Sequence, residues 1–426
     1  MQKRKRFQII LLLLSACFGI WFACDCKAYA DNEVVVVIDP GHGGENLGAQ
    51  YDGYTEKDMT MVVAKAMQEE LQKFENVTVY LTHDTDVDMS LKERAKFAQE
   101  KNADFLFSIH FNASVNHNLF GAEVWIPAYA DFYVKGYQFA EIQMAEFESM
   151  GLYSRGIKTK LNDIGEDYYG ILRHCSSMGI PSALLEHCHL DQENDKLFYQ
   201  QSEEQWKEFG KRDAEAVAKY FGLKSESKGV DYSNYEKVSV GMPKGAVKPD
   251  KSAPEVSEIE VLSVDEETAE ITVKMTATDS DGYIQYYKYS FDGGLTYSDL
   301  QKWPRTVWNH SEPEHTFKVT APFDREIDLR LCAYNGFDVW TESNCITLEA
   351  IAAPVIEEVP APQKQEYREI SYEPYAETEE ISMPMGETVK LIVLIVLISL
   401  LIAVILFAMI AMLLKARPRN RRRRAE

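Results

Sequence analysis

The sequence predicts an α/β domain with a mostly parallel sheet and helices on both faces. A β-sandwich domain of immunoglobulin or fibronectin type and a C-terminal transmembrane helix are expected to follow. Three observations support this architecture. Strand patterns alternate with helical patterns over residues 31–223, as in α/β domains. Short alternating strands with Asp-Gly and Asn-Gly turns fill residues 255–351. A long apolar run without charge occupies residues 391–414.

Both ends of the chain carry targeting patterns. Basic residues precede an apolar run and the small-x-small pattern Ala28-Tyr29-Ala30, which predicts a secretory signal peptide over residues 1–30. The run Leu391–Leu414 has 24 residues without a charge, enough at ~1.5 Å per residue to span a bilayer. The tail 415–426 is basic, and basic residues stay on the cytoplasmic side. We therefore expect a single-pass cell-membrane protein with residues 31 to about 389 outside the cell.

The elements of the first domain follow from local patterns. Residues 33–38 form an almost unbroken β-branched run, typical of a buried strand. Residues 59–74 place apolar side chains on one helical face. Ser90 and Glu93 form a capping box for a helix that ends at Glu100. The other expected elements are strands at 77–81, 105–110, 122–126 and 182–186, and helices at 133–150 and 203–221.

The remainder of the exterior part is expected to divide into three segments. Residues 224–254 are polar, with Ser, Lys, Gly and Pro, and predict a linker. Residues 352–390 are rich in Glu and Pro and predict an extended stalk. The β-sandwich between linker and stalk is expected to contain strands at 258–262, 270–277, 284–291, 316–319, 327–334 and 343–348. Within it, residues 279–282 (DSDG) resemble half of a calcium loop, but a plain turn explains them better.

Charge and cysteine content narrow the possible partners and bonds. The formal net charge is −22 although both ends are basic, which argues against binding of nucleic acid. Four of the seven cysteines lie beyond the signal region, and an exported protein can form disulfides. We hypothesise the bonds Cys175–Cys188 and Cys332–Cys345, and the sequence leaves both open.

Side chains of the metal-ligand type are expected to meet at one edge of the first sheet. His42 lies in the motif DPGHGG (39–44) after the first strand, and His110 and Glu186 end two other strands. Glu56 begins the first helix, next to the same edge. Ligands of open α/β sheets gather beyond the carboxyl ends of the strands. Two histidines and one carboxylate are a common catalytic zinc set that leaves the fourth position to water. We therefore expect one Zn²⁺ at this edge.

The stretch Glu186-His187-Cys188-His189 allows other interpretations. One is a second zinc site, and another is a Cys188 nucleophile with a histidine base. Side chains alternate along a strand, so Cys188 should face away from both neighbouring histidines, which disfavours both interpretations. The ligands of such a second site would come from His174, Cys175, Cys188 and either His187 or His189.

Residues 33–222 resemble the zinc-dependent N-acetylmuramoyl-L-alanine amidases, which are peptidoglycan hydrolases with DPGHGG and SIHxNA motifs. The resemblance implies that His42, Glu56 and His110 bind one Zn²⁺ and that Glu186 is the catalytic acid. It also implies hydrolysis of the amide between N-acetylmuramic acid and the L-alanine of the stem peptide. It rests on residues 39–44, 91–113 (ending in SIHFNA), 121–125, 155–158 and 180–186.

The implied roles agree with the chemistry of these residue types. Zinc lowers the pKa of its bound water, and Glu186 would take the proton and deliver it to the leaving amine. Arg94 also matches the family pattern. A buried ion pair explains this residue better than a catalytic role. After Glu186 the family usually continues with Gly-Phe and Ser-Asn, whereas this chain has residues 187–192 (HCHLDQ), which puts neighbouring substrate contacts in doubt.

Several hypotheses about function stay open at this point. The first is a membrane-anchored amidase whose catalytic domain faces the cell wall and acts on peptidoglycan. The second is an inactive amidase-like protein that binds the wall or acts as a scaffold, and the third is a zinc peptidase that cuts within the stem peptide. For the β-sandwich domain we expect a spacer role or recognition of a protein or wall partner.

Overall fold

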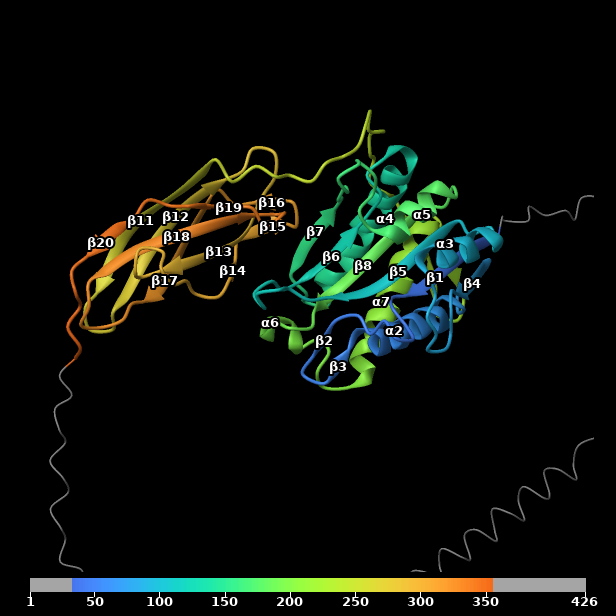
Figure 1. Cartoon of the computed structure of the whole chain (residues 1–426), viewed down its shortest axis with the longest axis horizontal. Helices are drawn as coiled ribbons and strands as arrows, with labels where there is room; N and C mark the ends of the chain where they lie inside the picture. The colour runs from blue at the N-terminus through green and yellow to red at the C-terminus, as the bar shows by residue number, and fades with distance from the viewer. Residues whose placement is uncertain (1–32, 355–426) are drawn as a thin grey trace, which may run out of the picture. The chain divides into compact units, whose positions relative to one another are not determined.

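The computed structural model describes residues 33–354, which belong to one compact unit. They form an N-terminal α/β part and a C-terminal part made of sheets (Figure 1). Within this range no helix is long and apolar enough to cross a membrane. The predicted signal peptide, nearly all of the stalk, the transmembrane helix at 391–414 and the basic tail lie outside the described residues.

The N-terminal part is built on a six-stranded sheet with the order β4-β1-β5-β8-β6-β7. Neighbouring strands are parallel except for β6 and β8, which pair antiparallel. This agrees with the mostly parallel sheet expected from the sequence. The strands are β1 (Val34–Pro40), β4 (Val77–Leu81), β5 (Phe105–Asn112), β6 (Ala122–Trp125), β7 (Ser154–Lys158) and β8 (Ser182–His189).

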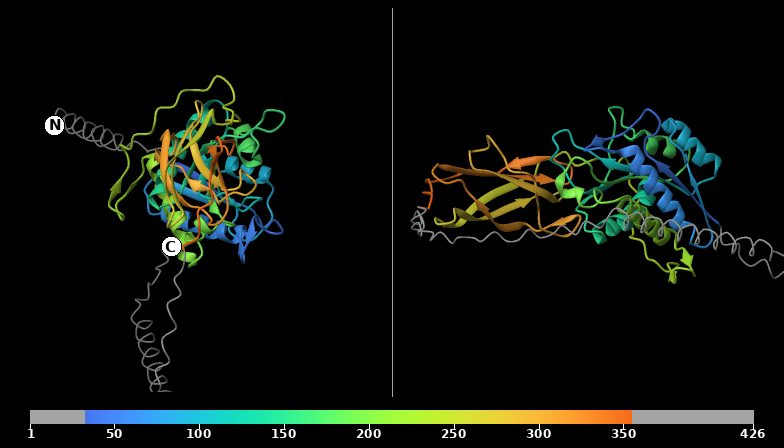
Figure 2. Two further views of the ribbon diagram at one scale, coloured as in Figure 1. Left: turned by 90° about the vertical axis from the view of Figure 1, so that its left-hand side faces the viewer. Right: turned by 90° about the horizontal axis from the view of Figure 1, so that it is seen from below.

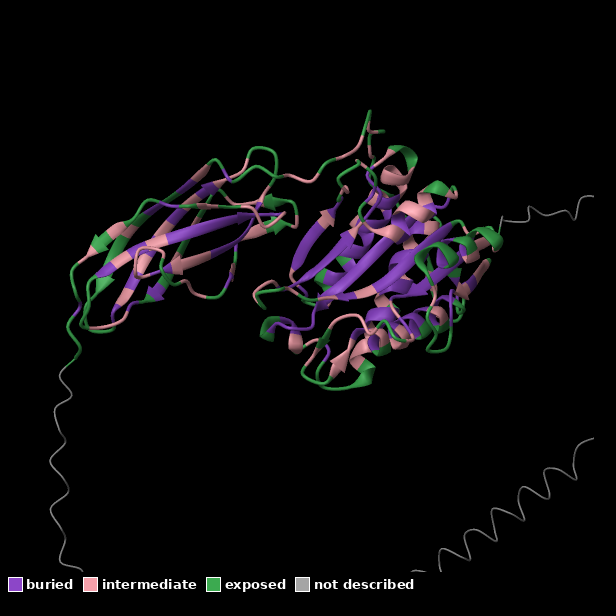
Figure 3. Ribbon diagram, in the orientation of Figure 1, coloured by how far each residue is buried: buried purple, intermediate pink, exposed green. Residues whose placement is uncertain are grey.

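Helices cover both faces of this sheet, and alternate residues of its strands enter two separate cores. The strands of the sheet are largely buried (Figure 3). In β1, Val36 and Ile38 pack in one core and Val37 packs in the other. The first core includes residues of α2 (Glu56–Leu71), α4 (Ala130–Ser149) and α7 (Glu203–Phe221). The second core includes residues of α3 (Leu91–Glu100) and α5 (Gly170–Ser177).

Local sequence signals account for several of these element boundaries. Ser90 and Glu93 form the expected capping box at the start of α3. Helix α2 begins directly after Thr55, although the Thr55 side chain makes no capping hydrogen bond. Strand β7 and helix α5 were not expected from the sequence. The remaining short elements before the linker are β2 (Gln50–Tyr51), β3 (Tyr54–Thr55) and α6 (Glu193–Lys196).

The C-terminal part contains two antiparallel sheets that enclose a common hydrophobic core (Figure 2). Alternate residues of β12, such as Ile271 and Val273, meet Leu329 and Leu331 of β18 in this core. The first sheet has the order β11-β12-β17, and the second has β14-β13-β18-β19 with β20 also paired to β18. Their strands are β11 (Val256–Asp265), β12 (Glu270–Thr278), β13 (Ile284–Ser290), β14 (Gln301–Lys302), β17 (Glu314–Thr320), β18 (Ile327–Asn335), β19 (Trp340–Glu342) and β20 (Ile346–Leu348). Two short hairpins complete the described chain, namely β9 (Lys224–Ser225) with β10 (Val230–Asp231), and β15 (Arg305–Val307) with β16 (His310–Ser311).

The two hypothesised disulfides are wrong, because all four described cysteines are free. Cys175 and Cys188 lie in the cores on opposite faces of the N-terminal sheet. Cys332 pairs across the sheet with Glu342 of β19, and Cys345 lies beyond that strand. Each hypothesised partner is therefore held away by the strand register or by the sheet itself.

The edge strand β7 is covered by the C-terminal part. Backbone carbonyls of Arg155 and Ser154 accept hydrogen bonds from Tyr283 Oη (3.0 Å) and Arg305 Nη2 (2.6 Å). Gly156 has a positive φ of 89°, and a Cβ at this position would overlap Tyr283 and the Trp308 ring. A glycine is needed here because the aromatic side chains approach the backbone so closely. The contacts satisfy polar groups that an open sheet edge would leave exposed.

Candidate active site

Three side chains from separate elements converge beyond the carboxyl ends of β1 and β5. Glu56 Oε1 lies 3.0 Å from His42 Nε2 and 3.0 Å from His110 Nδ1. One ligand atom from each residue lies within 4.8 Å of the other two. His42 follows β1, Glu56 begins α2 and His110 lies on β5. The structure thus brings together the three residues expected to bind zinc.

Glycines allow this close approach. A Cβ on Gly41 would overlap the His110 ring and would lie 2.6 Å from the backbone oxygen of Ile109. A Cβ on Gly48 would lie 2.5 Å from Glu56 Oε2, and Gly48 has a φ of 68° that favours glycine. Any larger residue at either position would displace a side chain of this cluster.

Hydrogen bonds orient the cluster. His42 Nδ1 lies 2.9 Å from Asn46 Oδ1, which fixes the ring so that Nε2 faces Glu56. Glu56 Oε2 accepts from the Ala49 amide at 2.7 Å, and Oε1 accepts from the Phe111 amide at 3.0 Å. Burial alone would raise the pKa of Glu56, but hydrogen bonds with His110 and His42 hold it well below its usual range. Two imidazole nitrogens and an ionised carboxylate fit a zinc ion.

Glu186 faces the same cavity from β8. In the strand register it lies opposite His110 on β5 and opposite Glu123 on β6. Its carboxyl is buried, and Oε2 has no hydrogen-bond partner among residues 33–354. Burial, followed by the charges of Glu56 and Glu123, raises its pKa well above the ordinary value. Glu186 lines a cavity of about 540 Å³ together with all three candidate ligands.

Glu123 is a buried carboxylate that the sequence reasoning did not single out. Its Oε2 lies 2.8 Å from Arg155 Nε and 2.9 Å from Lys158 Nζ. Its Oε1 accepts hydrogen bonds from Asn112 Nδ2 at 2.9 Å and Trp125 Nε1 at 3.0 Å. Burial would raise the pKa of Glu123, but Lys158 and Arg155 hold it well below its usual range. The signal in the sequence was a lone acid inside a strand that is otherwise apolar.

Arg94 forms the buried ion pair expected from the sequence. Its Nη1 lies 2.9 Å from Asp39 Oδ1 and donates to the Pro40 carbonyl at 2.6 Å. Its Nη2 donates to the His42 carbonyl, and its Nε to the Met89 carbonyl. Arg94 therefore holds the loop that carries His42, and it also lines the cavity of the candidate metal ligands.

The three residues after Glu186 are buried. His187 Nε2 lies 2.9 Å from Asp213 Oδ2, and its Nδ1 lies 2.9 Å from the His110 carbonyl. His189 Nδ1 lies 3.1 Å from the Gly121 carbonyl. A register shift between β5 and β8 at this point interrupts the regular alternation assumed from the sequence.

Neither alternative interpretation of this stretch finds support. In the described part of the chain, no metal-type cluster contains His174, Cys175 or Cys188. Burial raises the pKa of the Cys188 thiol well above its ordinary value, which opposes a role as nucleophile.

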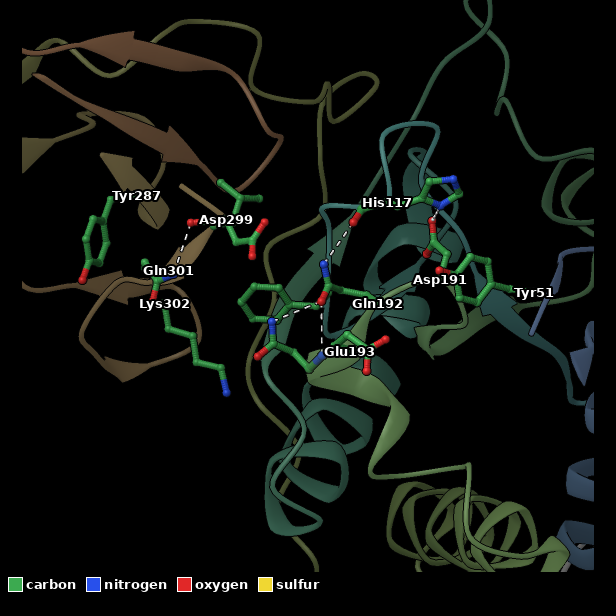
Figure 4. A pocket seen from close by; sticks show the side chains of 12 residues that line it. Tyr51, His117, Asp191, Gln192, Glu193, Tyr287, Asp299, Gln301 and Lys302 are labelled. Atoms are coloured by element: carbon green, nitrogen blue, oxygen red, sulfur yellow. Dashed lines mark hydrogen bonds and ion pairs between the residues drawn. The ribbon is translucent and has the colours of Figure 1, made fainter. Parts of the chain in front are cut away.

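A separate cavity of about 730 Å³ shares no lining residue with the candidate active site. In it Asp191 Oδ2 accepts hydrogen bonds from the Ser114 amide and lies 2.8 Å from His117 Nδ1, with Tyr51 beside them (Figure 4). Asp191 and Glu193 line one side of this cavity, and Asp299 and Lys302 line the other side (Figure 4). Its composition offers no set of metal ligands.

Comparison with known proteins identifies the N-terminal part. The family described as N-acetylmuramoyl-L-alanine amidase matches residues 36–219. Residues 36–219 are an amidase domain of this family. The match includes every residue of the candidate site described above.

Relatives of the amidase domain include enzymes and a phage protein. N-acetylmuramoyl-L-alanine amidase AmiC from Escherichia coli is 36% identical over 100 residues, which is 23% of this chain and 24% of AmiC. The endolysin of Bacillus phage SPP1 is 28% identical over 218 residues, which is 51% of this chain and 76% of the endolysin. N-acetylmuramoyl-L-alanine amidase CwlM from Bacillus licheniformis is 41% identical over 81 residues, 19% of this chain and 32% of CwlM. The chain thus spans about a quarter to a third of the length of two of these relatives.

Among solved structures, the catalytic domain of the amidase CwlV from Paenibacillus polymyxa is 26% identical to this chain. The alignment covers 45% of this chain and 99% of the CwlV domain, with a TM-score of 0.39.

Proposed function

We propose that this protein is a zinc-dependent N-acetylmuramoyl-L-alanine amidase that cleaves peptidoglycan between N-acetylmuramic acid and the L-alanine of the stem peptide. One observation carries the proposal. Glu56 lies within 3.0 Å of two histidine nitrogens, and the unpartnered Oε2 of Glu186 is buried at the same cavity. A metal triad beside a free carboxyl is the arrangement that zinc-assisted amide hydrolysis requires.

The residues divide the chemistry between them. His42, Glu56 and His110 would hold a zinc ion, which lowers the pKa of a water molecule and polarises the amide carbonyl. Glu186 accepts the proton of the attacking water and then delivers it to the leaving nitrogen of L-alanine. Burial raises the pKa of Glu186 above that of an ordinary carboxyl, which suits a group that must both accept and release a proton.

The unusual sequence after Glu186 leaves this machinery intact. His187 and Cys188 are buried in the fold and do not line the cavity of the candidate metal ligands. His187 supports the His110 backbone, and His189 lines a neighbouring cavity. The departure from the family pattern therefore affects the surroundings of the substrate more than the reacting groups.

We also propose that the amidase domain acts outside the cell on the wall, held by a transmembrane helix at 391–414. The support is the sequence alone, through the signal-peptide pattern, the apolar run and the basic tail. The division at 31–223, 224–254 and 255–351 is proposed on the same ground, with a spacer or recognition role for the last segment.

Product analysis tests the proposed reaction. Purified protein digesting peptidoglycan sacculi should release free stem peptides that begin with L-alanine, detected by mass spectrometry. A chelator should stop the release, and added zinc should restore it. Fragments cut within the stem peptide would identify a zinc peptidase instead. Absence of any product from a zinc-loaded preparation would leave an inactive wall-binding protein as the explanation.

A further inference from the structure

A large cavity of about 1110 Å³ adjoins the candidate active site. Both cavities are lined by Asn112, Ala113 and Tyr169, so a substrate in one can extend into the other. We propose that this second cavity is a subsite that binds a carboxylate of the stem peptide, next to the L-alanine. The inference rests on the proposed amidase function and names the form of substrate that the site prefers.

Unpaired positive charge distinguishes this cavity. It is lined by Lys160, Lys248 and Lys251, and none of their ammonium groups has a carboxylate within ion-pair distance in residues 33–354. The chain as a whole is acidic, with a net charge of −22. A cavity lined by three lysines without a carboxylate partner is therefore unusual for this protein. A lysine ammonium donates up to three hydrogen bonds and accepts none, which suits an anionic ligand.

Four of the other charged side chains of the lining are paired with one another. Glu123 pairs with both Arg155 and Lys158, and Arg155 also lies 2.8 Å from Asp338. Asp250 accepts hydrogen bonds from Ser252 and from Asn335. Asp163 and Asp250 are the lining acids that form no ion pair within residues 33–354. Three lysines against two aspartates leave a net positive charge for the ligand.

The linker is fixed so that its lysines reach this cavity. The Val247 amide donates to the Ala128 carbonyl at 2.8 Å, and the Val247 carbonyl accepts from Thr159 Oγ1 at 2.8 Å. Lys248 follows this anchor directly. Lys160 Nζ lies over the Tyr168 ring, 3.9 Å from its centre. The linker thus contributes to the substrate cleft as well as joining two parts of the chain.

A carboxylate is inferred as the ligand of the subsite from the chemical structure of the stem peptide. The cavity adjoins the candidate active site, and the residue after L-alanine lies on the peptide side of the scissile amide. Stem peptides offer carboxylates on the peptide side, and the one nearest to the scissile bond occurs either free or as a carboxamide. Ammonium groups bind a carboxylate more strongly than a neutral amide, because the hydrogen bond is charge-assisted.

A matched pair of substrates tests the subsite. One peptidoglycan preparation is used in two forms, with the residue after L-alanine carrying a free α-carboxylate or a carboxamide. The wild-type protein should have the lower KM for the carboxylate form, and added salt should reduce this preference by screening exposed charges. The Lys248→Gln/Lys251→Gln double variant should raise KM for the carboxylate form about fivefold and bring the ratio of the two kcat/KM values toward one. Lys244→Gln, in the same linker but outside the cavity lining, should keep the wild-type ratio.

The results distinguish failure of the proposed amidase function from failure of the proposed subsite. If wild-type protein cleaves neither form, the proposed function fails. If it cleaves both forms with equal kcat/KM, or if Lys244→Gln shifts the ratio as much as the double variant, the amidase stands and the subsite is overturned. An unchanged ratio in the double variant, with lost binding of a phosphate-rich wall polymer, would also overturn the proposal and assign the lysines to that polymer.

Discussion

Glu56 and Glu186 are two buried carboxyl groups at one cavity whose surroundings shift their pKa values in opposite directions. Burial would raise the pKa of both. Hydrogen bonds with His110 and His42 overcome this effect at Glu56, whereas Glu186 has no compensating donor and also experiences the charges of Glu56 and Glu123. Such a divergence separates a charged ligand from a proton carrier.

The Glu186→Gln variant should separate catalysis from metal binding. The amide has nearly the same shape as the carboxyl but cannot accept and return a proton. We expect kcat to fall about 10²- to 10⁴-fold while the protein keeps one bound zinc. Turnover of sacculi and metal analysis of the same preparation provide the two readouts. Zinc missing from this variant would mean that Glu186 is a ligand and that its assigned role is wrong.

Metal removal should be visible in stability without any substrate. A ligand that binds only the folded state stabilises it, by about 2.7 kcal/mol at a concentration 100 times its Kd. A chelator should therefore lower the Tm of the wild type and of Glu186→Gln. His110→Ala, which lacks one of the three candidate ligands, should show a Tm that no longer responds to zinc or chelator. An equal zinc response in all three proteins would contradict the assigned ligand set.

Glycines in the segment between β1 and α2 allow the candidate ligands of α2 and β5 to approach each other closely. In Gly41→Ala the new methyl group would overlap the His110 ring and approach the Ile109 carbonyl. We expect zinc affinity to fall about 10- to 100-fold, as when a supporting contact of a metal ligand is lost. Gly245→Ala is the control, because a Cβ there meets nothing within 4 Å. Zinc titration of both variants would measure the difference, and equal affinities would contradict the steric argument.

At the scale of elements, predictability from sequence depended on how each element is stabilised. Helix α7 (Glu203–Phe221) has the predicted bounds. Its apolar residues recur at helical spacing and pack in the core, so the local sequence pattern is enough to define it. Strand β7 was missed because its sequence, SRGIK, is polar and basic. Its Arg155 and Lys158 are buried only because Glu123 on the neighbouring strand neutralises them. A pairing of this kind depends on strand order, which local patterns do not contain.

At the scale of the whole molecule, site residues could be predicted only where their position does not depend on contacts between distant parts of the sequence. His42, His110 and Glu186 were placed together because parallel strands bring their carboxyl ends to one edge. The lysines at 248 and 251 could not be placed, since the contact of Val247 with Ala128 joins residues far apart in sequence. The disulfide hypotheses failed for the same reason, because cysteine count says nothing of which face of a sheet a thiol occupies.

The contact between Arg155 and Asp338 should couple the stability of the two parts of the described chain. Arg155 is buried, so Asp338→Ala removes one of its two carboxylate partners inside the fold. Breaking a fully buried pair costs about 3–5 kcal/mol. We expect about 2 kcal/mol here, because Asp338 is 30% exposed and Arg155 keeps Glu123.

Urea unfolding of the purified protein would measure this loss, with Glu342→Ala as the matched control. Glu342 pairs with Arg330 on the surface of the same sheet at 2.6 Å, and exposed pairs of this kind contribute about 0.2–1 kcal/mol. Asp338→Ala should therefore lower the free energy of unfolding clearly more than Glu342→Ala does. Equal effects would mean that Asp338 behaves as a surface residue and that the C-terminal sheets do not stabilise the edge of the amidase domain through Arg155.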